Sequence, residues 1–318
     1  MAAIRFRVLP NFRDREEKIK TRRTLNKWLL ITLFLLPGMG IFLTFLLMPI
    51  SQSFYLSLFK WNGLGPMTNF VGTDNYTTLL NNPIFQTAIL HSFILMALSL
   101  CIQLPMSLGL ALMLGRGELR GRRFFRGVLF VPFVFSEIIT AIIWLYVFKP
   151  ENGLLNTVLV STIPNFTPIS WLADRNIVLF GIFMVITWKY FGFHMILYMA
   201  GLQGISKDLE EAARVDGASE ATVLRYITLP LLGSTIRLTI FLSVLGSFQQ
   251  FVIIWIMTLG GPVNASEVIG TYLYKFGLVR FALGYGSAVA VILFGITLFF
   301  SLGYQRIVLR RDYTADPV

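Results

Sequence analysis

The stretch that decides the fold class runs from Trp28 to Phe59 and reads WLLITLFLLPGMGIFLTFLLMPISQSFYLSLF. It contains no charged residue, and it is longer than the roughly 20 apolar residues that cross the hydrocarbon core of a bilayer as a helix. The whole 318-residue chain has 55% hydrophobic and 14% charged residues, whereas soluble domains carry about 25% charged residues. This composition excludes a disordered chain, a coiled coil and a water-soluble globule. It predicts an all-α integral membrane protein.

Five further charge-poor runs follow the first one, so the sequence predicts six transmembrane helices. The runs place these helices at about 29–47, 93–114, 127–148, 177–202, 229–259 and 283–304. The predicted organisation is a basic N-terminal segment 1–27, a transmembrane domain 28–305 with a connecting loop 203–228, and a tail 306–318. The basic segment is too long for a secretory signal, and no small-residue cleavage pattern follows. The first apolar run is therefore interpreted as a retained span.

The distribution of positive charge predicts which way the chain faces. Of the 27 Lys and Arg residues, 20 lie in 1–27, 115–126, 203–228 and the tail from 305, which share one face of a six-span protein. The segments on the other face hold five. Because Lys and Arg collect on the cytoplasmic side, both termini are expected in the cytoplasm. The protein itself is expected to be a multi-pass protein of the cell inner (cytoplasmic) membrane. The net charge of +11 is thereby explained without a nucleic-acid partner.

The loop 203–228 differs from a plain tether because its acidic residues outnumber its basic ones. Within it, Asp208–Val215 is predicted to be helical, with Glu210 and Arg214 in the favourable i, i+4 order. Gly217 then supplies the left-handed conformation that ends a helix. One face of the predicted helix carries Leu209, Ala212 and Ala213, and the two alanines make its side chains small. The loop is therefore predicted to form a compact helix–turn–helix at the membrane surface.

The same loop carries a spaced motif, namely Glu211-Ala212-Ala213, Gly217 after three residues, and Ile227-x-Leu229-Pro230 after nine more. This pattern resembles the EAA signature of ABC importer permeases, and it is most similar to the carbohydrate-uptake branch of the maltose and glycerol-phosphate type. Matching context extends over most of the chain after Trp28, in segments 70–76, 197–203, 211–218, 259–262, 272–274 and 284–288. One departure is Ser206-Lys207, which stands where the family pattern has Ile-Pro.

The resemblance implies an ABC type I importer permease-like fold and a role as the transmembrane subunit of an ATP-driven importer of a sugar or oligosaccharide. It also implies four kinds of protein or lipid partner: a second homologous permease subunit, two ABC ATPase subunits, an extracytoplasmic solute-binding protein and membrane lipid. ATP and Mg would be bound by the ATPase subunits, with no cofactor in this chain. The implied ATPase-coupling residues are Glu210, Glu211, Ala212, Ala213, Asp216, Gly217, Ile227, Leu229 and Pro230.

The alternative for this loop is an amphipathic helix that lies on lipid. Its excess of acidic residues disfavours that interpretation, because the cytoplasmic leaflet is itself anionic.

Three ionisable residues lie inside the predicted spans. Glu137 and Lys189 fall near the bilayer centre, and Arg237 lies near the start of the fifth span. An isolated charge at that depth costs roughly 2.5–3.5 kcal/mol or more, so a partner or a wet cavity is expected. The favoured hypothesis is a Glu137–Lys189 ion pair, with Arg237 as a competing partner for Glu137. The other two hypotheses are contact with substrate hydroxyls and a proton or ion relay in a secondary, ion-coupled transporter.

A path for sugars needs amides and hydroxyls beside aromatic surfaces. The fourth and fifth spans offer such groups, and the candidates for the substrate path are Trp188, Tyr190, Tyr198, Ser247, Gln249, Gln250 and Trp255. Aromatic residues at helical spacing are also typical of packing and of interfacial belts. Polar side chains equally join helices, so both interpretations stay open.

The sequence argues against an enzyme. His91 and His194 lack a metal-ligand spacing, so no metal site is predicted. Neither a Gly-x-Ser-x-Gly elbow nor a phosphate-binding Gly-x4-Gly-Lys-Ser/Thr loop occurs, so no catalytic residue is assigned. The chain is therefore interpreted as a non-catalytic membrane subunit whose energy source lies in a partner.

Overall fold

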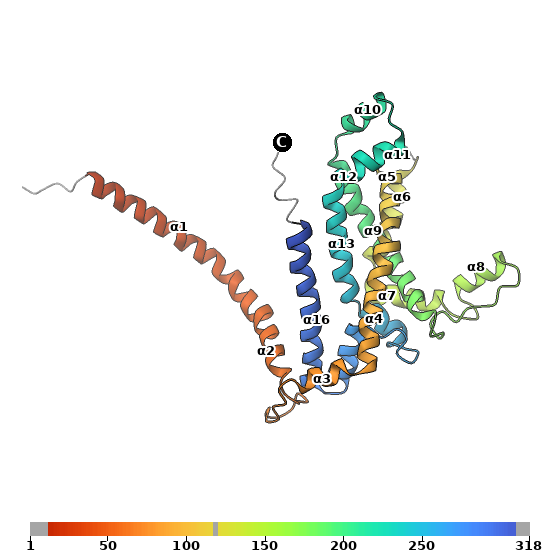
Figure 1. Ribbon diagram of the computed structural model, residues 1–318, viewed down its shortest axis with the longest axis horizontal. Helices are drawn as coiled ribbons and strands as arrows, with labels where there is room; N and C mark the ends of the chain where they lie inside the picture. The colour runs from red at the N-terminus through yellow and green to blue at the C-terminus, as the bar shows by residue number, and fades with distance from the viewer. Residues whose placement is uncertain (1–11, 117–119, 310–318) are drawn as a thin grey trace, which may run out of the picture. The chain divides into compact units, whose positions relative to one another are not determined.

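The computed structural model describes residues 12–116 and 120–309, and the described residues are predominantly helical (Figure 1). One isolated bridge between Phe59 and Phe70 is the sole strand-like pairing within those residues. The chain divides into two units, one ending at Tyr55 and the other beginning at Leu56. The predicted basic segment and tail lie partly outside the described residues. The all-α prediction is confirmed.

The first unit is one long helical stretch made of α1 (Phe12–Phe42), a π-helical turn η1 (Leu43–Leu47) and α2 (Met48–Leu56). Lys27–Leu56 is long and apolar enough to cross a membrane, and it contains the predicted first span. Its side chains are exposed almost throughout, including Phe34 at 81% and Phe45 at 76%. Such a surface suits a solvent of lipid rather than water.

The second unit holds the remaining elements. These are α3 (Asp74–Leu80), α4 (Pro83–Leu98), η2 (Ser99–Gln103), α5 (Leu104–Gly115), α6 (Arg122–Val134), α7 (Glu137–Val147), α8 (Leu154–Thr162), α9 (Val178–Gln203), α10 (Lys207–Val215), α11 (Glu220–Val223), η3 (Leu224–Thr228), α12 (Leu229–Leu231), α13 (Gly233–Phe248), α14 (Val252–Thr258), α15 (Ile269–Tyr272), η4 (Leu273–Val279), α16 (Leu283–Tyr304) and η5 (Gln305–Leu309).

Four helical stretches of the described chain are long and apolar enough to span a membrane, and two bent pairs raise the number to six. Three of the four lie in the second unit, at Pro83–Gly115, Val178–Gln203 and Leu283–Val308. The bent pairs are α6 with α7, at 101°, and Glu220–Leu231 with α13, at 66°. If each bent pair is one span, the described chain has six regions of membrane length, the number that the sequence predicts, and two of them are not straight helices.

The third predicted span, 127–148, is not one continuous helix. The backbone leaves the helix at Phe135 and Ser136, which are both extended, and α7 restarts with the Ser136 hydroxyl accepting from the Ile139 N–H at 3.2 Å. Pro132 inside α6 weakens the end of that helix because it cannot donate a backbone hydrogen bond. Glu137 consequently lies at the start of a helix, where its charge is favourable, and not in the middle of one.

The fifth predicted span, 229–259, is also interrupted. It comprises α12, α13 and α14, and residues Gln249–Phe251 separate the last two helices. The Phe251 backbone (φ −147°, ψ −62°) is not helical. Irregular backbone at membrane depth is tolerated only where it is buried in protein or lines a cavity, so this break indicates where a site lies.

The centre of the second unit is α9, in which 15 of 26 residues are buried. It packs against α5, α6 and α13, as Figure 1 shows. Gly192 permits the closest of these approaches, because a Cβ there would overlap the carbonyl oxygen of Leu129 on α6. Small residues at such crossings are typical of membrane helix packing.

Gly192→Ala is expected to lower the free energy of unfolding by about 1–3 kcal/mol, because α6 and α9 would be forced apart. The measurement is the thermal unfolding midpoint of the purified protein in detergent. Gly295→Ala in α16 is the control, since no atom lies within 4 Å of a Cβ built there. A Gly192→Ala protein with the wild-type midpoint would contradict the close crossing.

Candidate functional site: a polar cavity and a protruding loop

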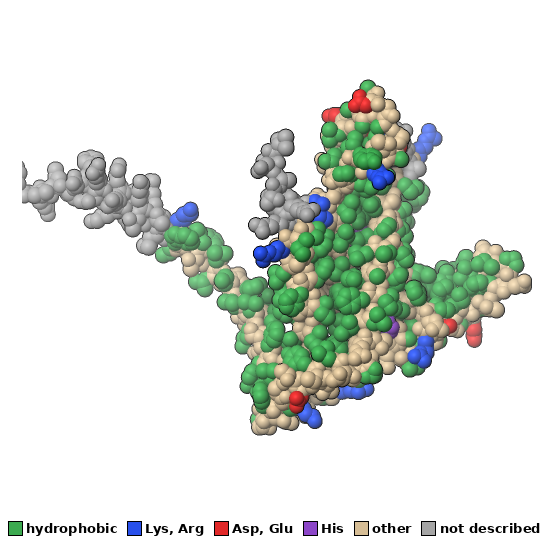
Figure 2. Space-filling model, in the orientation of Figure 1, with side chains coloured by type: hydrophobic (Ala, Val, Ile, Leu, Met, Phe, Trp, Pro, Cys, Tyr) green, Lys and Arg blue, Asp and Glu red, His purple; other side chains and the backbone are tan. Residues whose placement is uncertain are grey.

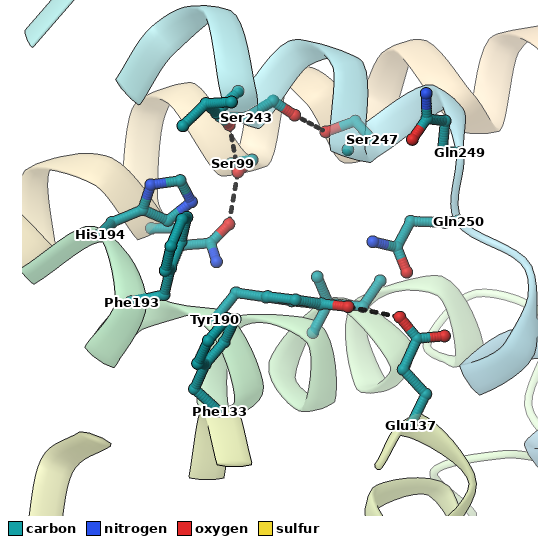
Figure 3. A pocket seen from close by; sticks show the side chains of 14 residues that line it. Ser99, Phe133, Glu137, Tyr190, Phe193, His194, Ser243, Ser247, Gln249 and Gln250 are labelled. Atoms are coloured by element: carbon teal, nitrogen blue, oxygen red, sulfur yellow. Dashed lines mark hydrogen bonds between the residues drawn. The ribbon is translucent and has the colours of Figure 1, made fainter. Parts of the chain in front are cut away.

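A polar cavity of about 230 Å³ lies beside two helix breaks, the one between α6 and α7 and the one between α13 and α14 (Figure 3). Its walls come from η2, the end of α6, the start of α7, α9, and α13 with the residues that follow it. The lining residues are Ser99, Gln103, Phe133, Glu137, Ile186, Tyr190, Phe193, His194, Leu242, Ser243, Gly246, Ser247, Gln249 and Gln250. The two helix breaks thus meet at one cavity.

Hydrogen bonds order the polar walls. The Ser99 hydroxyl donates to the Gln103 side chain and lies 2.7 Å from the Ser243 hydroxyl, which joins η2 to α13. Opposite them, the Tyr190 hydroxyl donates to the Glu137 carboxylate, which joins α9 to α7. Figure 3 shows the Gln250 amide and the Glu137 carboxylate facing the same open space. The cavity therefore presents hydroxyl, amide and carboxylate groups held by tertiary contacts.

Aromatic rings complete the cavity wall. Phe133 and Phe193 are stacked with centroids 4.7 Å apart, and Phe133 also meets the Tyr190 ring at 6.2 Å. Among the described residues that line the cavity, Glu137 is the sole Asp or Glu, and neither Lys nor Arg occurs. Polar groups beside apolar ring faces are the surface that a hydroxylated ring requires.

Four of the predicted path residues line the cavity, namely Tyr190, Ser247, Gln249 and Gln250. The other three do not. Trp188 packs edge-on against Trp144, Tyr198 is buried and accepts a hydrogen bond from Thr239, and Trp255 packs against Tyr274. In the described structure these three residues contact neighbouring helices, which fits the packing interpretation.

The cavity also contains residues that the sequence analysis did not select, namely Ser99, Gln103, Phe133, Phe193 and His194. A signal was available for two of them. Ser99 and Gln103 are polar residues four positions apart in an otherwise apolar span, which places them on one helix face. The aromatic residues gave no such signal, because they do not differ from the many Phe residues that face lipid.

The predicted Glu137–Lys189 ion pair is wrong. In the described structure Glu137 is bonded by Tyr190, while the Lys189 ammonium donates to the carbonyls of Phe133 (3.4 Å) and Phe135 (2.5 Å). Lys189 thus caps the interrupted end of α6, where free carbonyls and the helix dipole favour a cation. Arg237 lies one turn into α13, with its guanidinium beside Gly233.

The second candidate site is the loop of residues 203–228, which we call the coupling loop. It contains α10 and protrudes from one end of the helices of the second unit (Figure 1). Ser206 caps α10 by accepting from the Asp208 N–H at 3.2 Å, so the departure from Ile-Pro supplies a helix cap. Gly217 has φ +88°, and the bonds Gly217 N–H to Arg214 carbonyl and Ala218 N–H to Ala213 carbonyl close a Schellman turn. The predicted helix and its glycine stop are confirmed.

The predicted Glu210–Arg214 pair is replaced by two other ion pairs. Glu210 is buried and bonds Arg116 at 3.2 Å, whereas Arg214 reaches Glu220 on α11 at 2.6 Å. The hydrogen bond from Arg214 lowers the pKa of the Glu220 carboxyl below its ordinary value and raises the pKa of Arg214. The exposed pair therefore stays ionised and fixes α10 to α11.

The outer face of α10 has no partner within the described chain. Leu209 is 50% exposed and Val215 is 87% exposed, and Glu211, Ala212 and Asp216 are exposed as well. Acidic side chains gather at the tip of this loop (Figure 2). Ala213, Ile227 and Leu229 are half-buried and Pro230 is exposed. An apolar ridge with an acidic rim is typical of a surface that docks on another protein.

A multi-pass helical membrane protein with a polar cavity at broken helices and a protruding docking helix is the membrane-embedded subunit of a transport system. The chain belongs to the family described as binding-protein-dependent transport system inner membrane component, whose model matches residues 107–312. It therefore has the type I fold of ABC importer permeases. Membership of this family gives no support to an ion-coupled carrier.

Named relatives agree with this assignment. The chain is 32% identical to the arabinooligosaccharides transport system permease protein AraP of Bacillus subtilis, over 85% of this chain and 85% of that protein. It is 31% identical to the diacetylchitobiose uptake system permease protein NgcF of Streptomyces coelicolor, over 84% and 79%. Among solved structures, it is similar to a bacterial ABC transporter that imports the acidic polysaccharide alginate, with 26% identity, a TM-score of 0.77, and coverage of 91% and 99%.

Lys189→Met is expected to lower the free energy of unfolding by about 1–3 kcal/mol, because two carbonyls at the end of α6 lose their donor. Adding Glu137→Gln should not restore the lost stability, since the two charges have different partners. Thermal unfolding of the two single variants and the double variant in detergent measures this. Recovery in the double variant would show that the two charges depend on each other.

Proposed function

We propose that this chain forms the translocation path for a neutral oligosaccharide, as one of two permease subunits of an ATP-driven importer. The observation that carries the proposal is the cavity lined by Tyr190, Ser243, Ser247, Gln249 and Gln250 beside stacked aromatic rings. Hydroxyls and amides both donate and accept, so they match sugar hydroxyls, whereas the rings match the apolar faces of pyranose units. Two relatives are named for the transport of arabinooligosaccharides and the uptake of diacetylchitobiose, which supports the same class.

The electrostatics of the cavity favour a neutral sugar over a uronate. Its one carboxylate, Glu137, accepts hydrogen bonds from hydroxyl groups and repels a second carboxylate. Within the described lining there is no Lys or Arg to neutralise an anion, since Lys189 is turned toward backbone carbonyls. This arrangement suits sugars such as arabinooligosaccharides better than an acidic polysaccharide. The chain would then differ in substrate from the alginate importer whose fold it shares.

The coupling loop supplies the contact with the energy source. An unpartnered ridge of Leu209, Ala212 and Val215 is the surface that would enter a groove on an ABC ATPase subunit, with Glu211 at the rim. Two such ATPases would bind ATP and Mg, and a second homologous permease subunit would complete the cavity. An extracytoplasmic solute-binding protein would deliver the sugar, in keeping with a family of binding-protein-dependent transport systems.

Two contacts in the structure support the predicted orientation of the chain in the membrane. The Arg116–Glu210 bond brings Arg116 and the coupling loop to one end of the second unit, in keeping with the six-span prediction. The contact between His91 and the Glu267 carbonyl, 2.9 Å long, joins two segments predicted at the opposite end. We place the end with the coupling loop in the cytoplasm, because the positive charge collects there.

Glu137→Lys is expected to reduce uptake of the neutral substrate by at least about tenfold, because the substitution removes the carboxylate that accepts hydrogen bonds and leaves the Tyr190 hydroxyl without its acceptor. Uptake is measured in proteoliposomes that hold the complete transporter and its loaded binding protein, with neutral and uronate oligosaccharides of equal length. The Glu151→Lys variant, which makes the same change at an exposed position outside the cavity, serves as the control. Faster uptake of the uronate than of the neutral sugar by the wild-type complex would contradict the assigned substrate class.

Gly217→Glu is expected to abolish transport while the protein still enters the membrane. The glycine has φ +88° and open space around it, so the substitution strains the Schellman turn and adds bulk to the docking surface without a clash inside this chain. The readout is uptake divided by the amount of protein in the membrane. Gly65→Glu is the matched control, with φ +69° and open space in a loop outside the coupling segment. Normal uptake by the Gly217 variant would remove the loop from the coupling role.

A further inference from the structure

The attachment of α10 to the rest of the protein is unusual, because it depends on a charge. Among the residues of this helix, Glu210 is the one that is buried, at 5% exposure. Its neighbours Leu209 and Glu211 are exposed, and Ala213 is half-buried. A helix that docks on its own protein ordinarily does so with an apolar stripe. Here a carboxylate occupies the position where that stripe would make contact.

Two side chains hold the Glu210 carboxylate. Its Oε1 lies 3.2 Å from Nη2 of Arg116 and accepts a hydrogen bond of 3.0 Å from the Thr228 hydroxyl. The same Nη2 of Arg116 also donates to the Ile205 carbonyl at 3.2 Å. The side chains of Glu210 and Arg116 are only 7% and 19% exposed, so water screens this pair weakly. We call these four residues the charge clamp.

The charge clamp joins α10 to three membrane-spanning segments. Arg116 directly follows α5, Ile205 follows α9 by two residues, and Thr228 ends η3, which leads through α12 into α13. Both α9 and α13 contribute walls to the polar cavity. Figure 1 shows α10 above the ends of α5 and α12. One carboxylate thus connects the docking helix to the helices that surround the path.

The exposed Arg214–Glu220 pair does a different task. It joins α10 to α11 inside the loop and touches none of the spanning helices. Exposed pairs of this kind contribute little and are screened by salt. Buried pairs with further hydrogen bonds are directional, and loss of one partner leaves the other charge uncompensated. The exposed pair is therefore a weak contact inside the loop, whereas the buried pair sets the position of the loop on the bundle.

We propose that Glu210 and Arg116 are the coupling residues that make α10 move as one body with the ends of α5, α9 and α13. This inference rests on the proposed function, in which an ATPase moves α10. Motion of the docking helix then reaches the cavity through the charge clamp. Without the clamp, α10 stays docked on the ATPase but moves without carrying the spanning helices along. ATP hydrolysis and substrate uptake are thereby separated.

The test measures the ratio of substrate transported to ATP hydrolysed in proteoliposomes that hold the complete complex and its loaded binding protein. Glu210→Gln and Arg116→Gln are each expected to lower this ratio by about fivefold or more, the lower end of the range for coupled sites. Arg116→Lys, which keeps the charge but replaces the guanidinium with a shorter and more strongly hydrated ammonium, should give an intermediate ratio. In every variant the ATPase subunits should still co-purify with the permease.

The double variant Glu210→Gln/Arg116→Gln separates coupling from mere stability. If the pair only avoids an orphaned buried charge, removing both charges repairs the defect. The charge clamp instead predicts that the double variant is as uncoupled as either single one. Recovery of the wild-type ratio in the double variant would overturn the inference, as would single variants that keep the wild-type ratio.

The matched control is a second buried pair, in which Lys275 bonds Glu267 at 2.5 Å and Glu267 is fully buried. Glu267→Gln should lower the thermal midpoint but leave the transport ratio unchanged, because this pair is not connected to α10. An equal loss of coupling there would overturn the inference. Failure of the proposed function itself is distinguishable, since the wild-type complex would then lack bound ATPase, and that result would overturn both.

Discussion

Backbone polar groups inside a bilayer have no water to bond, and this constraint organises the whole second unit. Where the chain stays helical, the requirement is met locally. Where it breaks, at Phe135–Ser136 and at Gln249–Phe251, other parts of the protein must supply partners. Lys189 does so at the first break by donating to two carbonyls. The helix breaks, the buried lysine and the polar cavity are therefore consequences of one constraint.

The same reasoning explains why charged residues are kept at depth in this protein. Glu137 begins α7 and accepts from Tyr190, and the ammonium of Lys189 lies at the end of α6, so each charge is placed where a helix dipole favours it. An ion pair between them would have left the carbonyls of α6 without donors. Lys189 therefore caps the end of α6, whereas Glu137 on the neighbouring helix α7 presents its carboxylate to the cavity.

Local interactions shape the coupling loop, and a residue distant in the sequence attaches it to the bundle. Ser206, Ser219 and Gly217 set the limits of its short helices through caps and a left-handed turn, which are local interactions. Its orientation on the bundle comes from Arg116, about 90 positions earlier in the chain. Local interactions build the shape that a partner would contact, and a distant residue determines which spanning helices move with it.

The sequence by itself determined the membrane class, the six apolar regions, the helix and glycine stop of the coupling loop, and four of the cavity residues. These features depend on composition, periodicity and nearest neighbours, which a sequence records directly. Only the tertiary structure decided the breaks in two spans and the true partners of Glu137, Lys189 and Glu210. It also brought Ser99 and Gln103 into the cavity. The physical reason is that a buried polar group accepts whichever partner folding brings within 3 Å or so, and residues such as Arg116 and Glu210 become neighbours only after the helices have packed.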